Sequence, residues 1–408
     1  MAKREALGAW LHGLKVAELT TRRPGEVRCQ YTAEAVARWE LNTPLLSCSL
    51  PLVPKVHQSA GVFFAGLLPE GRHLEAMASK AGVPTYDTFG ILARFGRDVA
   101  GAIVISAEDP GDRPGTVSNY TRAELAEEVG GLPDHPLGLY DDSELSVAGL
   151  QNKLLLVAVG AGWGRPVHGF ASTHILKVED RRYPGMAEME AACLRVASEV
   201  GLTAVDVAVE DLGGLPSLIV SRFDRAAGAA GTVTRVHQED TCQALGRDPA
   251  ANRGRGKYED GGGPSWLEVA RLLEAFSRDP LKELDRLVRV CTYTVLIGNA
   301  DAHGKNLAVL HPKPGHVTLA SLYDAVPTVQ WPKLRRNMAM SINGRFGIGL
   351  ATVDDVVAEA TTWHLDASAA RGAAMETTDQ VVDAVARVGA PPALAKAIRA
   401  RALAFLTR

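Results

Sequence analysis

The chain has 408 residues, 46% of them hydrophobic and 22% charged, which exceeds one ordinary core and predicts two or three domains. Its formal net charge of −3 argues against a surface that binds nucleic acid unaided, although a local basic patch or a DNA-binding partner remains compatible with it. The five cysteines are scattered and include no CxxC pair, which argues against a disulfide framework or a zinc site. The sequence shows no signal peptide and no apolar run of about 18 residues, so we expect a cytoplasmic protein without a membrane span.

Residues 1–112 predict a mixed N-terminal α/β region. The apolar runs GVFFAGLLPE (61–70) and VAGAIVIS (99–106) are typical of strands, whereas RHLEAMASKAG (72–82) is typical of a helix. The turn-rich segment SAEDPGDRPGTVS (106–118) then predicts a linker to a second region.

The second region, to about residue 224, alternates strand and helix patterns. LSVAGLQNKLLLVAVG (145–160), STHILKVED (172–180) and LPSLIVSRFDR (215–225) predict strands, and residues 185–202 predict a helix that ends near Gly201. Gly149 lies in the turn between apolar segments, where close approach of the backbone to an anion is possible, but taken alone this stretch is better explained by a plain hairpin turn.

Two polar features of this region each allow two interpretations. Lys177 lies within an apolar strand, so it is either a phosphate-binding lysine of the kinase type, with Glu190 as its ion-pair partner, or an edge-strand lysine in water beside a solvated glutamate. The strand IVSRFDR is either a hinge whose backbone pairs with adenine or a strand end closed by Arg–Asp pairs.

Beyond residue 225 the pattern becomes mainly helical. NRGRGKYEDGGGPS (252–265) predicts a mobile loop because it is polar and rich in glycine. Residues 281–298 predict a helix stopped by Gly298, and a strand pair at 306–310 and 317–327 follows it. Residues 380–389 and 394–406 predict two further helices.

The loop IGNADAHGKNLAVL (297–310) carries the strongest chemical pattern. An acid, Asp301, is followed five residues later by an amide, Asn306, and a further acid, Asp324, lies on the returning strand. Kinases use this order for the residue that orients the substrate hydroxyl and for two oxygen ligands of Mg²⁺. The alternative is a solvated loop with a capping asparagine and a turn histidine, and Asn299 and Lys305 are expected to cap the helix or face solvent.

Taken together and in order, SVAGLQNKLLL, THILKVED, SRFDR, HQEDTCQALG, GNADAHGKNLAVL and SLYDAVP resemble the HipA family, as does the N-terminal region. These are serine/threonine-protein kinase toxins of type II toxin–antitoxin systems, associated with persistence. The resemblance implies an α+β, two-lobed protein-kinase-like fold: an extra N-terminal α/β subdomain (1–112), an N-lobe with the phosphate loop (113–224) and a mainly helical C-lobe (225–408).

The resemblance also implies residue roles. Asp301 would be the catalytic residue, Asn306 and Asp324 would bind Mg²⁺, and Ser146 would be autophosphorylated, which silences the kinase. The ATP-binding residues would be Ala148, Gly149, Leu150, Gln151, Asn152, Lys153, Lys177, Ser221, Arg222, Phe223, His303, Asn306, Tyr323 and Asp324. Two departures weaken this transfer: Ser221 replaces the glutamate of some members, and Met189 precedes Glu190 where asparagine is frequent.

The partners implied by the resemblance are a helix-turn-helix antitoxin (HipB-like), operator DNA reached only through that complex, and a protein serine substrate, glutamyl-tRNA synthetase in the studied cases. Three alternatives remain open. One is a degenerate kinase that acts as an antitoxin-binding co-repressor, and another is a small-molecule phosphotransferase. The third, a zinc hydrolase built on Asp301 and His303, lacks a third ligand at suitable spacing.

Overall fold

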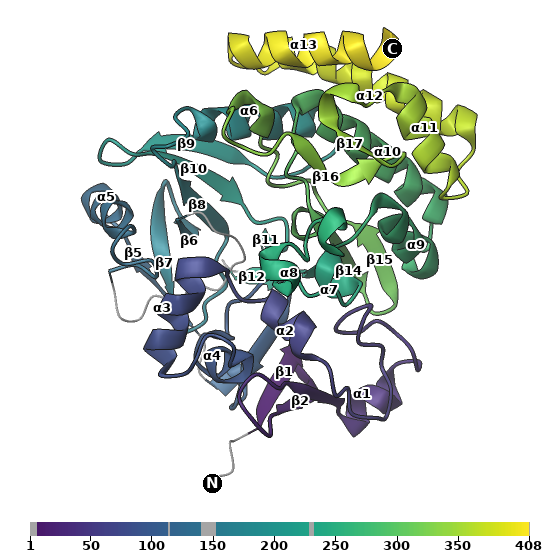
Figure 1. The fold of residues 1–408 in the computed structure, drawn as a ribbon. Coiled ribbons are helices and arrows are strands. Elements are labelled where there is room, and N and C mark those ends of the chain that lie inside the picture. The colour runs from purple at the N-terminus through teal and green to yellow at the C-terminus, as the bar shows by residue number, and fades with distance from the viewer. Residues whose placement is uncertain (1–5, 113–114, 140–151, 228–231, 408) are drawn as a thin grey trace. The chain divides into compact units, whose positions relative to one another are not determined.

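The structure, a computed structural model, describes residues 6–112, 115–139, 152–227 and 232–407 (Figure 1). It contains two compact units that interleave along the chain. The first comprises Met1–Val178, Glu210–Glu239 and His311–Gly315, and the second Glu179–Val209, Asp240–Leu310 and His316–Arg408. Both helices and sheets are present, which confirms the predicted α+β class.

The N-terminal part of the first unit is a sheet covered by short helices. The sheet has the strand order β3 (Arg28–Tyr31), β2 (Leu14–Thr20), β1 (Leu7–Leu11), β4 (Ile103–Ser106). The helices are α1 (Ala33–Arg38), α2 (Gly61–Gly66), α3 (Gly71–Ala81) and α4 (Thr88–Phe95). The strand expected at 61–70 is wrong, because α2 occupies it and buries Phe63 and Phe64. A short, continuously apolar run does not distinguish a buried helix from a strand.

A second sheet of the first unit carries the predicted phosphate-binding lysine. Its strand order is β5 (Thr116–Asn119), β7 (Gly162–Val167), β6 (Lys153–Val159), β8 (His174–Val178), β10 (Pro216–Ser221), β9 (Val207–Asp211). The expected linker at 106–118 is therefore only partly correct, since its end joins this sheet as strand β5. Helix α5 (Arg122–Gly131) begins at a capping box formed by Thr121 and Glu124 and packs its Leu125 and Val129 into a small core beside the sheet.

The second unit is mainly helical. Its longer helices are α6 (Met186–Glu199), α9 (Trp266–Phe276), α10 (Pro280–Ile297), α11 (Val353–Thr361), α12 (Ala367–Arg387) and α13 (Pro392–Thr407). Helix α10 contacts α9, α11, α12 and α13 (green to yellow in Figure 1), and it ends at Gly298, whose φ of +76° confirms the expected stop. No helix in the described ranges is both long and apolar enough to span a membrane.

The glycine-rich segment 252–265, which the sequence predicted to be a mobile loop, is folded into tight turns. It contains α8 (Ala251–Gly254) and the 3₁₀ turn η3 (Glu259–Gly261). Its main chain is hydrogen-bonded internally, for example from Gly263 N to Tyr258 O at 2.8 Å. A Cβ atom on Gly256 would lie 2.0 Å from the Asp248 carbonyl, so this glycine permits close packing of the backbone.

After the polar loop, the first strand is shifted along the chain from the expected 306–310, and the second ends well before residue 327. Strand β14 (Ala308–Lys313) is followed by β15 (His316–Leu319), and Ala320 N donates to Ala308 O at 2.9 Å. The chain then leaves the strand, so Asp324 lies in a turn with φ +50° and not on the returning strand that the sequence predicted. The remaining short elements are β11 (Arg225–Ala227), β12 (Val233–Arg235), β13 (His237–Asp240), α7 (Thr241–Ala244), β16 (Asn337–Ile342) and β17 (Arg345–Gly347).

Candidate active site

The polar loop that follows α10 is organised by a buried asparagine. Asn299 is 5% exposed, and its Oδ1 accepts a hydrogen bond from Asp301 N at 3.1 Å. Its Nδ2 donates to the main-chain oxygen of Asp324 at 3.1 Å. Asn299 therefore holds the two acidic segments together, and the expectation that it merely caps the helix or faces solvent is wrong.

Lys305 is also buried, contrary to the expectation of a solvent-facing side chain. Its Nζ lies 2.9 Å from Asp240 Oδ2, and that carboxylate additionally caps α7 through Gln243 N. Next to this pair, Thr241 Oγ1 donates to Gly304 O at 2.6 Å. A buried ion pair with satisfied hydrogen bonds fixes geometry strongly, so the loop is anchored to α7.

Asp301 has one carboxylate oxygen held and the other available. The Tyr258 hydroxyl donates to Oδ1 at 2.9 Å, whereas Oδ2 accepts no hydrogen bond from the residues that the structure describes. Burial raises the pKa of Asp301 above its usual range, although the Tyr258 hydrogen bond and the charges of Lys257 and Arg335 oppose the rise, and Asp324 adds to it. The result is an oriented carboxylate with increased basicity. Nothing in the sequence pattern pointed to Tyr258.

Two further oxygen donors lie on the same framework. Asn306 donates through Nδ2 to Asp301 O at 3.1 Å, and its Oδ1 accepts no hydrogen bond within the described chain. Asp324 is tied to the loop through Asn299, and Tyr323 beside it donates its hydroxyl to Lys305 O at 2.7 Å. A carboxylate and an amide oxygen form the hard donor set that suits Mg²⁺.

His303 is buried within this loop and is not the solvated turn histidine of the alternative interpretation. Burial, with the positive charges of Lys257 and Lys305, lowers the pKa of His303 to about 3, against an opposing effect of Asp324. Its ring meets that of Tyr258 edge-on, with 5.2 Å between centroids. The imidazole is therefore neutral at physiological pH and adds no positive charge to the site.

The predicted phosphate-binding residues belong to the first unit. Lys177 lies on β8, an internal strand between β6 and β10, so the edge-strand alternative is wrong. Lys153 on β6 is directly opposite Lys177, which places both lysines on one face of the sheet. Asn152 precedes β6, and its carbonyl accepts from Val178 N at 3.0 Å. The predicted residues Ser146, Ala148, Gly149, Leu150 and Gln151 lie outside the described residues.

Arg222 belongs to a buried charge cluster, defined here as Asp98, Arg222, Asp224, Arg225 and Arg235. Its guanidinium donates to both carboxylate oxygens of Asp224 at 2.9 and 2.8 Å. The interpretation of SRFDR as a strand end closed by Arg–Asp pairs is thus confirmed for the side chains. Burial would raise the pKa of Asp98 and Asp224, but the surrounding arginines lower both below their usual range.

The main chain around this cluster bears on the proposed adenine site. Ser221 ends β10 opposite His174, and Arg222 N donates to Thr173 O at 2.9 Å, so that N–H is already used. Adenine contacts of Ser221, Arg222 and Phe223 remain a prediction.

Glu190 on α6 of the second unit is 1% exposed, so the solvated alternative is wrong for it. Its pairing with Lys177 stays a prediction.

Comparisons with known proteins place the chain in a family. The HipA N-terminal domain family matches residues 7–106, and the HipA-like C-terminal domain family matches residues 145–388. Y4mE of Sinorhizobium fredii, provisionally named a kinase, is 35% identical over 94% of this chain and 91% of its own. The serine/threonine-protein kinase toxin HipA of Shewanella oneidensis is 28% identical over 79% of this chain and 77% of its own.

A solved structure of the Shewanella oneidensis MR-1 toxin–antitoxin system, HipA with HipB and operator DNA, has the same fold. The TM-score is 0.81 at 24% sequence identity, over 98% of this chain and 95% of that one. The family matches span most of the chain in the order that a HipA protein requires. The chain belongs to the HipA family of kinases.

Proposed function

We propose that the protein is a serine/threonine-protein kinase toxin that uses Mg·ATP. The observation that carries this proposal is the geometry of Asp301: one oxygen is fixed by Tyr258, the same loop presents the donor Asn306, and Asn299 holds the segment of Asp324 beside that loop. A kinase needs positioning and charge compensation more than covalent chemistry, and a rigid loop of this kind supplies the positioning.

In the proposed reaction, Asp301 Oδ2 accepts the proton of a substrate serine hydroxyl. The serine oxygen forms a bond to the γ-phosphorus while the bond from that phosphorus to the bridging β,γ-oxygen breaks. Bound ATP would supply the phosphoryl group, and Mg²⁺ held by Asn306 and Asp324 would neutralise its charge. A neutral His303 would leave the positive charge of the site to the metal and the lysines.

The lysine pair of the first unit supports a phosphate site. Lys153 and Lys177 bring two positive charges to one face of the sheet, which suits the binding of a phosphate. We assign them to the ATP phosphates, under the predicted 148–153 loop, and assign Ser221, Arg222 and Phe223 to adenine. The side chain of Arg222 is committed to the buried charge cluster, so we assign adenine contacts there to backbone atoms.

Regulation and partners are proposed from the family. Phosphorylation of Ser146 would place a nearly dianionic group beside the ATP phosphates and thereby inactivate the kinase. By analogy with the Shewanella oneidensis complex, we propose a HipB-like helix-turn-helix antitoxin that mediates contact with operator DNA. The substrate would be a serine of a cytoplasmic protein, with glutamyl-tRNA synthetase as the first candidate.

The decisive experiment compares wild type with Asp301→Asn. After incubation with Mg·ATP, mass spectrometry should detect one added phosphate on wild type, at Ser146, and none on the variant, while phosphoproteomics after expression should identify the protein substrate. Absence of transfer by wild type, together with equal harmlessness of both proteins in cells, would refute the proposal. ATP binding without transfer would instead identify a degenerate kinase acting as co-repressor, and phosphorylation of a small alcohol a small-molecule phosphotransferase.

A further inference from the structure

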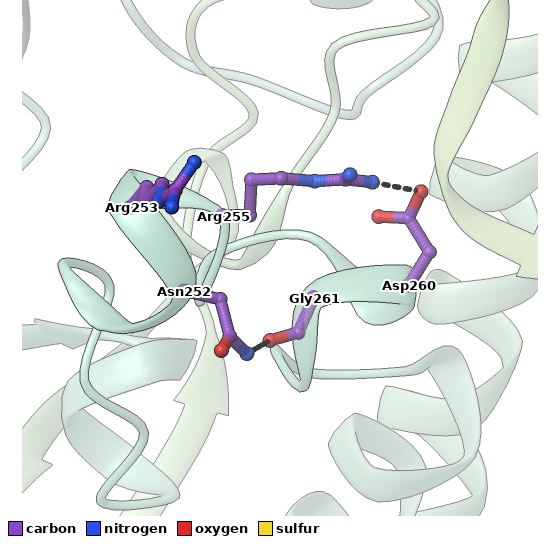
Figure 2. A pocket seen from close by; sticks show the side chains of 5 residues that line it. All are labelled: Asn252, Arg253, Arg255, Asp260 and Gly261. Carbon is purple, nitrogen blue, oxygen red and sulfur yellow. Dashed lines mark hydrogen bonds and ion pairs between the residues drawn. The ribbon is translucent and has the colours of Figure 1, made fainter.

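The segment 252–261 forms an arginine-lined pocket in the second unit. The pocket has a volume of about 460 Å³ and is lined by Asn252, Arg253, Arg255, Asp260 and Gly261. Figure 2 shows Arg255 reaching across it to Asp260, at 2.6 Å, while Asn252 donates to Gly261 O at 2.6 Å. No site described above includes these five residues.

The charge of the pocket favours an anion. Asp260 is shared by two guanidinium groups, since it also lies 3.3 Å from Arg335. Arg253 is exposed and makes no ion pair with any residue in the described ranges. Two arginines thus share the Asp260 carboxylate, whereas Arg253 has no carboxylate partner among the described residues, and Arg255 is more than half exposed to solvent. A ligand carboxylate could bind to Arg253 and Arg255 while Asp260 stays paired with Arg335.

The backbone of the pocket is strained in a way that fixes its arginines. Asn252 and Arg253 have φ values of +51° and +61°, a region that side-chain-bearing residues rarely adopt, least of all two in succession. The Asn252–Gly261 hydrogen bond and the bond from Gly256 N to Ala251 O at 2.9 Å hold this conformation. Such strain is concentrated at ligand-binding positions in proteins.

A short series of contacts connects the pocket to the catalytic carboxylate. Arg335, which pairs with Asp260, stacks its guanidinium over the Tyr258 ring at 4.5 Å, and the Tyr258 hydroxyl donates to Asp301. In addition, Gly304 N in the catalytic loop donates to Lys257 O at 3.0 Å. The segment that carries the arginines therefore also supports the residue that would receive the substrate hydroxyl.

From this arrangement, we infer that the Arg253–Arg255 pocket binds an aspartate or glutamate of the protein substrate, near its phosphoacceptor serine in the sequence. The inference rests on the proposed kinase function and deepens it, because it names a determinant of substrate selection. Asp301 acts on any serine hydroxyl that reaches it, whereas the pocket would select segments in which an acidic side chain accompanies that serine.

A degenerate peptide library tests the inference, with a fixed serine and every residue type at each flanking position. Full-length wild type with Mg·ATP should prefer Asp or Glu over Asn or Gln at one position by about fivefold, as expected for a partly exposed ion pair. The double variant Arg253→Ala/Arg255→Ala should lose that preference, Arg253→Lys/Arg255→Lys should retain most of it, and the matched control Arg399→Ala on α13 should match wild type.

The charge-reversed variant Arg253→Glu/Arg255→Glu keeps the test independent of folding losses. It should favour Lys or Arg at the same position, a gain that only folded enzyme can display. The inference would be overturned if the alanine variant kept the acidic preference. It would also be overturned if wild type phosphorylated the library without any acidic preference. Either result would leave the kinase proposal intact. Failure of wild type to phosphorylate both the library and Ser146 would overturn the proposed function and this inference with it.

Discussion

Replacing Tyr258 with phenylalanine removes one hydroxyl from the site and keeps the ring that Arg335 and His303 contact. The lost bond is a 2.9 Å hydrogen bond to a largely buried carboxylate, worth roughly 1.5–3 kcal/mol for a charged acceptor. Because the phenol favours the ionised form of Asp301, its loss should raise the pKa of Asp301 further. At a given pH below that pKa, the ratio of ionised to protonated Asp301 should fall roughly ten- to hundredfold.

The assay is the pH dependence of kcat for phosphate transfer. A base must be ionised to act, so activity is lost as the pH falls through its pKa, and Tyr258→Phe should begin to lose activity at higher pH than wild type. The plateau at high pH should change much less than the acidic limb. Tyr86→Phe, at a tyrosine that is 65% exposed, is the matched control. An acidic limb that stays in place, or that moves to lower pH, would show that Tyr258 does not stabilise the carboxylate.

Three further outcomes follow from the buried groups. The imidazole NMR signals of His303 should not titrate between pH 5 and 8, because its pKa lies at about 3; a titration in that window would contradict its burial. Lys305→Met leaves Asp240 buried and unpaired and should lower the free energy of unfolding by about 3–5 kcal/mol in urea, against less than 1 for exposed Lys282→Met. Because the arginines depress the pKa of Asp224, its ionised form stabilises the folded protein at pH values above the usual pKa of aspartate. This contribution to the free energy of unfolding is lost as the pH falls below about 4. The urea midpoint should thus stay level from pH 8 to 5 and then drop, and Asp224→Asn should weaken that drop.

The sequence allowed prediction of the features that depend on local pattern. The end of α10 at Gly298 and the order of the kinase motifs could be read from periodicity and spacing. Strand β8 and helix α6 were found for the same reason, since each repeats apolar residues at the period of its own geometry. Helix α2 was missed because its apolar residues are consecutive, and a continuous apolar run shows neither the helical nor the strand periodicity.

The parts that could not be predicted depend on partners distant in the sequence. Asn299 and Lys305 looked solvated because nothing near them in sequence shows that Asp324 and Asp240 would satisfy them. Tyr258 lies 43 residues before Asp301 in a segment whose glycines suggest mobility, although they in fact permit dense packing. Polar residues are assigned to the surface by default, and only a tertiary contact reverses that assignment.

The two hydrogen bonds of Asn299 have an evolutionary consequence. One amide is bonded to the main chain at both Asp301 and Asp324, although 22 residues, including strands β14 and β15, separate these acids along the chain. Their spacing is therefore set by a local bridge and not by the length of the polypeptide between them. Insertions or deletions in the turn between β14 and β15 could therefore accumulate during evolution without changing the distance between the two acids.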